Sequence, residues 1–416
     1  MEYGEYKSRL REIVLQKLDY TKEQSDEEVL ALIDNVLLEW EKGRLLPICI
    51  SRRLRTELFD SLRRLDILQN LVEDTTVTEI MINGPNHIFV EKDGMLIKWD
   101  HVFESAEKLK DVIQQIVAGC NRVVNEASPI VDARLTNGSR VNIVMDPIAL
   151  NGPIVTIRRF PDKPIDMERL IQNHSITAQV ADFLKTLVIA KYNIFISGGT
   201  GSGKTTFLNV LSGFIPKSER IITIEDSAEL QLQGLENLVR LETRNSNVEG
   251  CLEITMRDLI KSSLRMRPDR IIVGEVRGAE AADLVTCWNT GHEGSISTGH
   301  SNSAKDMLSR LETMILMGMT IPLEAIRRQI ASGIDILVHL GRLRDGSRKV
   351  LEVLEITGYE DGEFLLNPLF QFEETEKNRQ ENKEQFAQEG NLVVGALCKK
   401  GDLINDKKLV AAGLQL

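Results

Sequence analysis

The sequence contains no apolar run of about 18 residues, the length that an α-helix needs to cross a bilayer. Its first residues, from Met1 to Lys7, also lack the basic and then apolar segments of a secretory signal peptide. We therefore expect a cytoplasmic chain without a membrane-spanning segment. Any association with a membrane would be peripheral, through a partner protein.

Cysteine is scarce and scattered. No two of the five cysteines have the C-x-x-C spacing of a zinc site, and their odd number and wide separation do not suggest a disulfide framework. This usage fits a reducing compartment such as the cytoplasm. The five positions are Cys49, Cys120, Cys251, Cys287 and Cys398.

Basic residues are fewer than acidic residues in this sequence. The 416 residues include 51 lysines and arginines against 62 aspartates and glutamates, which gives a net charge of −11 at pH 7. This balance argues against non-specific binding to a nucleic-acid backbone, although it is compatible with a local basic face. We therefore expect no direct nucleic-acid partner.

The most informative segment that is present is a glycine-rich run. It follows a short apolar stretch, residues 192–197, that predicts a buried strand, and it precedes residues 207–211, which predict a helix. A strand, the pattern G-x-x-x-x-G-K-[ST] and a helix form a P-loop, whose backbone N–H groups surround phosphate oxygens. The predicted nucleotide-binding residues are Gly198, Gly199, Thr200, Gly201, Ser202, Gly203, Lys204, Thr205 and Thr206.

The residues of this loop have separate expected roles. The four glycines allow the backbone to adopt positive φ. Lys204 is expected to reach the β- and γ-phosphates, and the Thr205 hydroxyl is expected to bind Mg²⁺. The sequence therefore predicts a nucleoside triphosphate with Mg²⁺ as the ligand.

Two further apolar strands lead to acidic residues. The strand predicted at residues 221–224 precedes Glu225 and Glu229, and the strand at residues 271–273 precedes Glu275. Phosphoryl transfer needs carboxylates that hold Mg²⁺ or orient the attacking water. We take Glu229 as the candidate for orienting the water and Glu275 as the Mg²⁺ ligand, although the two roles could be exchanged. The alternative for each acid is a salt-bridged strand end.

A segment rich in glycine, serine and threonine follows at residues 290–303 and contains His292 and His300. Histidines in such a segment could sense the γ-phosphate through hydrogen bonds, or titrate near neutral pH. Suitable further ligands are lacking nearby, which argues against a zinc pair. We take His300 as a candidate catalytic residue.

The rest of the sequence predicts several domains. Ser25 and Glu28 form a capping box before a helical pattern, and short apolar strands within residues 80–97 predict a β-meander. Beyond residue 177, strands and helices alternate, which predicts a mostly parallel sheet. The expected divisions are a helical segment at 1–72, an α+β domain at 73–160, a linker at 161–176, an α/β domain at 177–372, and a charged linker with a C-terminal segment at 373–416.

Taken in order, these motifs resemble those of the type II/type IV secretion-system motor ATPases. The zinc-binding cysteine insertion of many type II assembly ATPases is absent, and the most similar branch is the CpaF-like ATPase of tight-adherence (Flp) pili. The matching segments are 198–206 as Walker A, 224–230 as the Asp box, 274–278 as Walker B and 290–302 as the His box, with further matches upstream at 78–84, 131–135, 138–142 and 156–160.

The resemblance implies an α/β, RecA-like P-loop ATPase domain preceded by a small α+β (PAS-like) domain and an N-terminal helical segment. It also implies that arginines of the N-terminal domain reach the triphosphate when the domains close. By motif position these are Arg140 and Arg158, with Arg134 and Arg159 as further candidates. A guanidinium stabilises the charge of a transferring phosphoryl group; the alternative for each arginine is a structural ion pair.

The resemblance finally implies a cytoplasmic motor that uses ATP and Mg²⁺ to power pilus assembly or protein secretion. Its expected partners are copies of itself, in a homohexameric ring, and the platform proteins of the inner membrane. One alternative is a conjugative type IV secretion ATPase or another DNA-translocating RecA-like ATPase. The other is a nucleotide-gated scaffold with little turnover, against which the intact set of Lys204, Thr205, Glu229 and Glu275 argues.

Overall fold

The computed structural model describes residues 3–19, 21–22, 24–41, 47–92, 95–120, 122–159, 165–244, 252–374 and 393–416. The chain divides into two compact units, Met1–Lys163 and Pro164–Leu416, with the division inside the segment predicted as a linker. The other predicted domain boundaries stay predictions. Parts of that linker, most of the charged segment at 373–390, and Cys251 lie outside the described residues.

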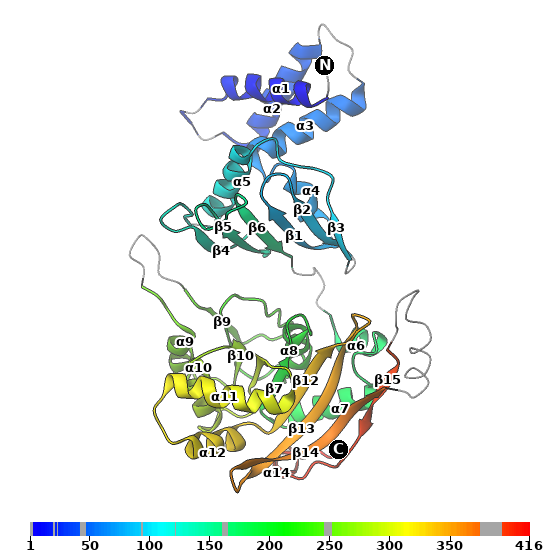
Figure 1. Ribbon diagram of the computed structural model, residues 1–416, viewed down its shortest axis with the longest axis vertical. Coiled ribbons are helices and arrows are strands. Elements are labelled where there is room, and N and C mark those ends of the chain that lie inside the picture. Colours follow the sequence, from blue (N-terminus) through cyan, green and yellow to red (C-terminus); the bar gives the residue numbers. More distant parts are fainter. Residues whose placement is uncertain are drawn as a thin grey trace. The chain divides into compact units, whose positions relative to one another are not determined.

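The N-terminal unit begins with three helices that pack on one another, α1 (Tyr3–Lys17), α2 (Asp26–Glu41) and α3 (Ile48–Arg63) (Figure 1). The predicted capping box is confirmed, because the Ser25 N–H donates to Glu28 Oε2 at 2.9 Å and the Glu28 N–H donates to Ser25 Oγ at 3.2 Å. The buried apolar residues of the three helices are Leu10, Val14, Val29, Ile33, Val36, Leu37, Leu54, Leu58 and Phe59.

The rest of this unit is an antiparallel sheet of order β3-β2-β1-β6-β5-β4. Helices α4 (Leu68–Glu73) and α5 (Ala106–Gly119) pack their apolar residues into one core with the sheet. The predicted meander is confirmed, because β1, β2 and β3 are neighbours in chain order. The strands are β1 (Val77–Asn83), β2 (Ile88–Lys92), β3 (Met95–Lys98), β4 (Ile130–Arg134), β5 (Arg140–Val144) and β6 (Ile154–Arg158).

The C-terminal unit is built on a nine-stranded sheet of order β15-β14-β13-β12-β7-β11-β10-β8-β9. The six strands from β12 to β9 in this order run parallel, as the alternating sequence pattern predicts. They are β7 (Ile194–Gly198), β8 (Ile221–Glu225), β9 (Leu238–Glu242), β10 (Arg270–Val276), β11 (Ile296–His300) and β12 (Ile336–Arg342).

Helices cover both faces of the parallel strands (Figure 1). Successive side chains of a strand point to opposite faces, so Ile194 and Ile196 of β7 pack in one core with α6 to α8, whereas Phe195 packs in a second core with α9 to α12. The helices are α6 (Met167–Gln172), α7 (Ala178–Ile189), α8 (Lys204–Ser212), α9 (Met256–Ser263), α10 (Glu280–Trp288), α11 (Ala304–Gly318) and α12 (Leu323–Gly333).

The C-terminal segment completes one edge of the sheet. Strands β13 (Arg348–Glu360), β14 (Glu363–Glu374) and β15 (Gly395–Lys399) form an antiparallel extension, and α14 (Lys407–Ala412) follows. The buried Glu355 carboxylate accepts the backbone N–H groups of Ile404 at 2.9 Å and Asn405 at 2.7 Å, which attaches the end of the chain to β13. So short a segment could not be assigned from sequence without its strand partner.

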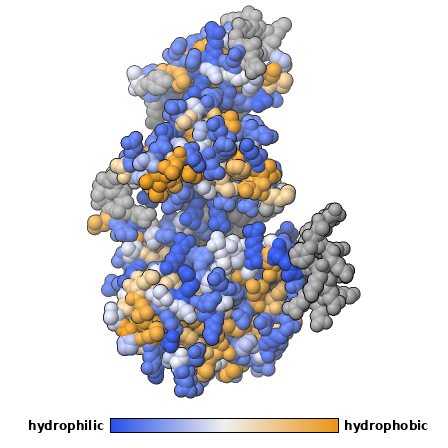
Figure 2. Space-filling model, viewed as in Figure 1, coloured by the Kyte–Doolittle hydropathy of each residue, from blue (hydrophilic) through white to orange (hydrophobic). Residues whose placement is uncertain are grey.

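Hydrophilic residues cover much of the visible surface of each unit, and apolar residues form smaller groups between them (Figure 2). Among the described helices, none is both long enough and apolar enough to cross a bilayer. The functional positions are set by the sheet: β7, β11, β10 and β8 are adjacent and parallel, so their carboxyl ends share one edge. Ligands of open α/β sheets bind at that edge.

Candidate nucleotide-binding site

The glycine-rich loop joins the carboxyl end of β7 to the start of α8, as its sequence predicts. Gly201 and Gly203 adopt positive φ angles of 71° and 93°. Gly198 is required by space, because a Cβ there would lie 2.5 Å from the Leu340 carbonyl oxygen of β12. Gly199, the fourth glycine of the loop, does not adopt positive φ.

Lys204 is a buried cation at the start of α8, with 7% of its surface exposed. Its ammonium donates to the carbonyls of Gly198 at 3.1 Å and Gly199 at 3.0 Å, and it lies 3.2 Å from His300 Nδ1. These contacts use its three N–H donors. Burial lowers the pKa of Lys204, and the charge of Glu275 opposes that shift without contacting the ammonium. No carboxylate among the described residues forms an ion pair with Lys204, and a phosphate would supply the missing counter-ion.

Glu275 and His300 extend this contact into a line of three side chains. Glu275 lies near the end of β10, with Oε1 2.8 Å from His300 Nε2, and its Oε2 accepts a hydrogen bond from Arg277 Nη2 at 2.8 Å. Because the Lys204 ammonium faces Nδ1, the proton of a neutral imidazole lies on Nε2. Burial lowers the pKa of His300, which favours this neutral form, while Glu275 acts in the opposite direction. The structure thus brings Lys204, Glu275 and His300 together.

Glu229 lies in the loop after β8, and a residue to which the sequence analysis gave no role holds this loop. Glu225 ends β8, is 3% exposed, and accepts through Oε1 the backbone N–H groups of Glu229 at 2.7 Å and Leu230 at 2.8 Å. Burial raises the pKa of Glu225 to about 7. The signal in the sequence was the position of this acid as the last residue of a buried, mostly apolar strand.

The predicted Mg²⁺ ligands Thr205 and Glu275 lie at the same edge of the sheet, in the first turn of α8 and near the end of β10. Mg²⁺ commonly binds one or two protein oxygens together with substrate phosphates and water. Within the described ranges, no group of three or more histidine, cysteine, aspartate or glutamate residues could hold a metal ion. A Mg²⁺ ion at this edge would therefore need phosphate oxygens to complete its shell.

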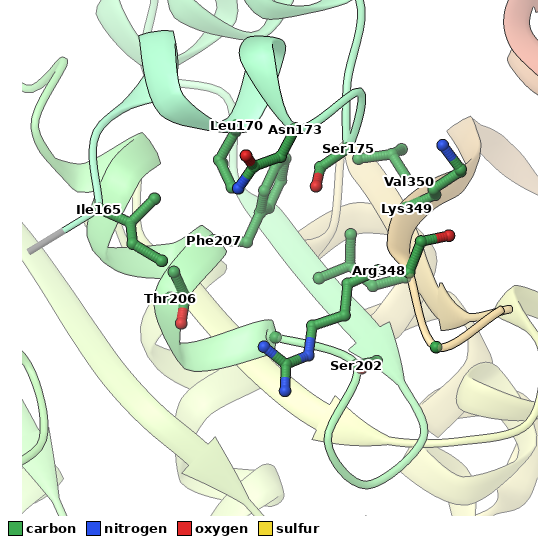
Figure 3. Close-up of a pocket in the computed structure, with 14 residues that line it drawn as sticks. Ile165, Leu170, Asn173, Ser175, Ser202, Thr206, Phe207, Arg348, Lys349 and Val350 are labelled. Atoms are coloured by element: carbon green, nitrogen blue, oxygen red, sulfur yellow. The ribbon is translucent and has the colours of Figure 1, made fainter. Parts of the chain in front are cut away.

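A cavity of about 380 Å³ adjoins the loop at Ser202, Gly203 and Thr206. Arg348 reaches from β13 toward the loop, where its Nε donates to the Gly201 carbonyl at 2.9 Å (Figure 3). This size and a mainly apolar wall suit a small ligand such as a nucleoside. The sequence analysis missed the cavity because its walls come from distant segments: Ile165, Leu170, Phe207, Leu340 and Val350.

A second cavity, of about 490 Å³, borders the loop at Gly199 and Thr200. His300 lines it together with polar residues that include Asn302, just before α11, and Arg310, in the middle of α11. His300 therefore contacts the buried ammonium through one nitrogen while its ring borders a polar space beside the loop. A water molecule or a terminal phosphate has room there.

The predicted arginines lie in the N-terminal unit. Arg134 of β4 is directly opposite Arg140 of β5, which is directly opposite Arg158 of β6. Directly opposite residues project from the same face of an antiparallel sheet, so these three arginines form one row. The row continues with an acid, because Glu79 of β1 is directly opposite Arg158. Arg159 follows β6 and is outside this row.

The parallel sheet, with a P-loop after β7 and acids after β8 and near the end of β10, defines a P-loop nucleotide-binding protein of the RecA-like α/β class. The predicted fold class, including the small α+β domain in front, is confirmed. The chain belongs to the family of type II/IV secretion system proteins, which matches residues 62–390.

Individual relatives agree with this assignment. The chain is 34% identical to the conjugal transfer protein TrbB of Rhizobium radiobacter, over 77% of this chain and 96% of that protein. It is 31% identical to the type IV secretion system protein PtlH of Bordetella pertussis, over 69% of this chain and 91% of that protein. The crystal structure of the pilus retraction motor PilT with bound ADP shares the fold, with a TM-score of 0.50, 18% identity, and 71% and 83% of the two chains covered. The resemblance seen in the motifs is confirmed at the level of the family.

Proposed function

We propose that this protein is a Mg²⁺-dependent ATPase that acts as a motor of a type II/IV secretion machine. The observation that carries the proposal is the state of Lys204. Its ammonium is buried at the P-loop and held by two carbonyls and His300, with no described carboxylate in contact. Burial already disfavours the charged form, so an anionic phosphate that restores a counter-ion would bind there strongly.

In this proposal the loop from Gly198 to Thr206 and the N-terminus of α8 hold the phosphates. The adenosine would lie in the cavity beside Thr206 and Arg348. Thr205 and Glu275 would hold Mg²⁺, which when bound neutralises charge on the phosphates. Lys204 would leave the carbonyls of the loop for the β- and γ-phosphates, and His300 would then report the presence of the γ-phosphate, because it contacts both Lys204 and Glu275.

The reaction needs a positioned water and stabilised phosphoryl charge. Glu229 would orient a water whose oxygen bonds to the γ-phosphorus as the bond to the β,γ-bridging oxygen breaks, which gives ADP and phosphate. Arg140 and Arg158, with Arg134 in the same row, would stabilise the charge of the transferring group when the two units close on the nucleotide. Their shared position supports this role, because one face of the sheet presents three guanidinium groups in a single row.

For its place in the cell, we infer a homohexameric ring in the cytoplasm, associated peripherally with proteins of an inner-membrane platform. Family membership supports this assembly. Two kinds of machine remain candidates: the motif resemblance favours the assembly of tight-adherence pili, whereas the similarity to a conjugal transfer protein favours conjugative type IV secretion. The net charge of −11 argues against direct contact with DNA in either case.

One experiment separates the proposed motor from a DNA-translocating ATPase and from a nucleotide-gated scaffold: measuring particle mass and ATPase rate together, with and without nucleotide and with and without DNA. We expect a hexamer that hydrolyses ATP at a rate that DNA does not change. Stimulation by DNA would favour a DNA-translocating motor, and nucleotide binding with negligible turnover would indicate a scaffold. A protein that binds no nucleotide would contradict the whole assignment.

A further inference from the structure

We infer that Glu225 is a positioning residue, whose carboxylate fixes the backbone at Glu229 and so places the acid that orients the water. Its effect on rate rests on the proposed ATPase function, whereas its effect on the loop does not. The sequence pattern marks both acids alike, as residues after an apolar strand. The structure gives them different roles, because the Glu225 carboxylate is buried against the backbone that carries Glu229.

The first support is the pair of hydrogen bonds. A single oxygen of Glu225 accepts N–H groups from the consecutive residues Glu229 and Leu230, at 2.7 Å and 2.8 Å. Each hydrogen bond to a buried acceptor stabilises the fold, and two donors on one oxygen fix a turn more firmly than one. Leu230 is itself 1% exposed, so both donors are drawn inward.

The second support is the way in which Glu225 is itself fixed. Its backbone carbonyl accepts the Thr243 N–H at 3.0 Å, as part of the β8–β9 pairing. Its side chain lies in the space that Gly274 leaves on β10, where an added Cβ would be 3.0 Å from Glu225 Cγ. Glu225 is therefore held between β9 and β10, the strand that carries Glu275, and its carboxylate has little freedom to follow a moving loop.

The third support is that the ends of the loop are attached elsewhere. Near its start, Thr243 Oγ1 donates to Asp226 Oδ1 at 2.8 Å. Near its end, the Gln231 N–H donates to Asn209 Oδ1 at 2.9 Å, which ties the loop to α8, the helix that begins at Lys204. Glu225 fixes the middle, where Glu229 lies. The loop is thus connected to both the P-loop helix and the Glu275 strand.

A competing role for Glu225 is that of the catalytic base. Its Oε1 is already used by two N–H groups, and its Oε2 is buried without a hydrogen-bond partner among the described residues. Positioning needs an acceptor oxygen but no charge, whereas a base needs a carboxylate. Glu225→Gln distinguishes the two, because glutamine keeps one acceptor oxygen at the same place.

The test uses the full chain and two readouts. Hydrogen exchange of the segment 226–231, without nucleotide, should rise about tenfold in Glu225→Ala and stay near wild type in Glu225→Gln. The kcat for ATP should fall about 100-fold in Glu225→Ala, with nucleotide Kd within about threefold, because a misplaced Glu229 affects the reaction more than binding. Glu225→Gln should keep at least about a third of the wild-type kcat, whereas Glu229→Gln should not. The matched control is Glu236→Ala, an exposed acid of the same segment.

Two results would overturn the inference. One is Glu225→Gln losing turnover as fully as Glu229→Gln while exchange of the loop is unchanged, which would make Glu225 the base. The other is Glu225→Ala with unchanged exchange. If Glu225→Ala does not fold, Glu225→Asp replaces it, since the shorter side chain cannot reach both donors and should raise exchange. A wild-type protein without ATP turnover would count against the proposed function, and the exchange measurement would still decide the role of Glu225 in the loop.

Discussion

Lys204 and Arg270 are buried cations at opposite edges of the same parallel sheet. Arg270 begins β10 and is 0% exposed, and each guanidinium nitrogen has a partner. Nε and Nη2 donate to the two carboxylate oxygens of Glu219 at 2.6 Å and 3.0 Å, and Nη1 donates to the carbonyls of Val188 and Gly294 at 2.6 Å and 3.2 Å. Lys204, at the carboxyl edge, has two carbonyls and an imidazole but no described carboxylate.

The two cations show that one sheet carries a structural ion pair at one edge and a ligand-binding cation at the other. At the amino edge, the buried charge of Arg270 is neutralised by Glu219. The hydrogen bonds of this pair connect α7, the segment before β8, β10 and the segment before β11. At the carboxyl edge, Lys204 and Glu225 form no ion pair within the described part of the chain. Burial lowers the pKa of Lys204 and raises that of Glu225 to about 7. A charge buried without a counter-ion destabilises a fold. We therefore expect substitutions at the carboxyl edge to affect turnover and those at the amino edge to affect stability.

The largest effect is expected at Lys204. Lys204→Ala removes the ammonium that would contact the β- and γ-phosphates, and it should lower turnover by about 1000-fold or more. Steady-state phosphate release measures this, with Lys305→Ala, an exposed lysine of α11, as the control. A folded Lys204→Ala protein that keeps more than about a tenth of wild-type turnover would contradict the assignment of the site.

At the amino edge, Arg270→Met should lower the free energy of unfolding by about 3–5 kcal/mol, because it removes the buried partner of both Glu219 carboxylate oxygens. The buried carboxylate would then keep only the partly exposed Lys191 ammonium, 4.0 Å away. Denaturant unfolding measures the loss. The double variant Arg270→Met with Glu219→Leu should recover most of it, since the uncompensated charge is gone. Equal stability of the single and double variants would show that the pair is not the structural anchor that we describe.

The uncompensated acid at the carboxyl edge gives a pH dependence. Because burial raises the pKa of Glu225 from 4.5 to about 7, the folded state holds a proton that the unfolded state has lost between these values. The contribution of Glu225 to the free energy of unfolding is therefore fully present below pH 4.5 and is lost as the pH rises through 7. Relative to wild type, Glu225→Gln should gain about 2–3 kcal/mol in the free energy of unfolding between pH 5 and pH 8. An identical stability difference at both pH values would contradict the uncompensated burial.

Glu229→Gln and Glu275→Gln should each lower turnover by about 100-fold while keeping nucleotide binding. Both changes remove a charge and preserve shape, so contacts with the P-loop survive. Equilibrium binding of a fluorescent ATP analogue and single-turnover hydrolysis measure the two properties separately. If a variant folds but fails to bind nucleotide, the acid concerned has a structural role and its catalytic assignment is wrong.

In the N-terminal unit, Arg140→Ala and Arg158→Ala should lower turnover by about tenfold or more, with little change in the melting temperature of the nucleotide-free protein. They should also weaken stabilisation by nucleotide, because linkage depends on contacts made in the bound state. Lysine at either position should rescue poorly, since an ammonium lacks the guanidinium fork. Normal hydrolysis in both alanine variants would exclude the closing mechanism, and Arg277 or a neighbouring subunit would have to supply the cation.

The features that depend on a local pattern could be predicted from the sequence alone. The P-loop needs glycine at particular positions and a strand and helix around it, and all of these are contiguous from residue 192 to residue 211. The capping box at Ser25, the meander from β1 to β3 and the alternation of the parallel strands are local in the same sense. Their prediction needed only periodicity and turn chemistry.

The features that the sequence did not predict depend on long-range contact. Arg348 contacts Gly201 although the two are 147 positions apart in the chain, and no pattern in either segment predicts this contact. The role of Glu225 depends on the space left by Gly274 on a strand about fifty residues away. The row of Arg134, Arg140 and Arg158 depends on strand register, which the hydrophobic pattern alone did not give.

The most direct test of the account is a matched pair of methionine substitutions, measured by thermal unfolding with and without Mg²⁺–ATP. Methionine keeps an apolar stem in place of each buried cation and removes only the charged group. We predict that Lys204→Met is at least as stable as wild type without nucleotide and gains nothing from Mg²⁺–ATP, whereas Arg270→Met is much less stable and keeps a nucleotide-dependent gain of about 2.7 kcal/mol at 100 times Kd. If Lys204→Met is destabilised as strongly as Arg270→Met and is still stabilised by Mg²⁺–ATP like wild type, the charge of Lys204 is structural and the account is wrong.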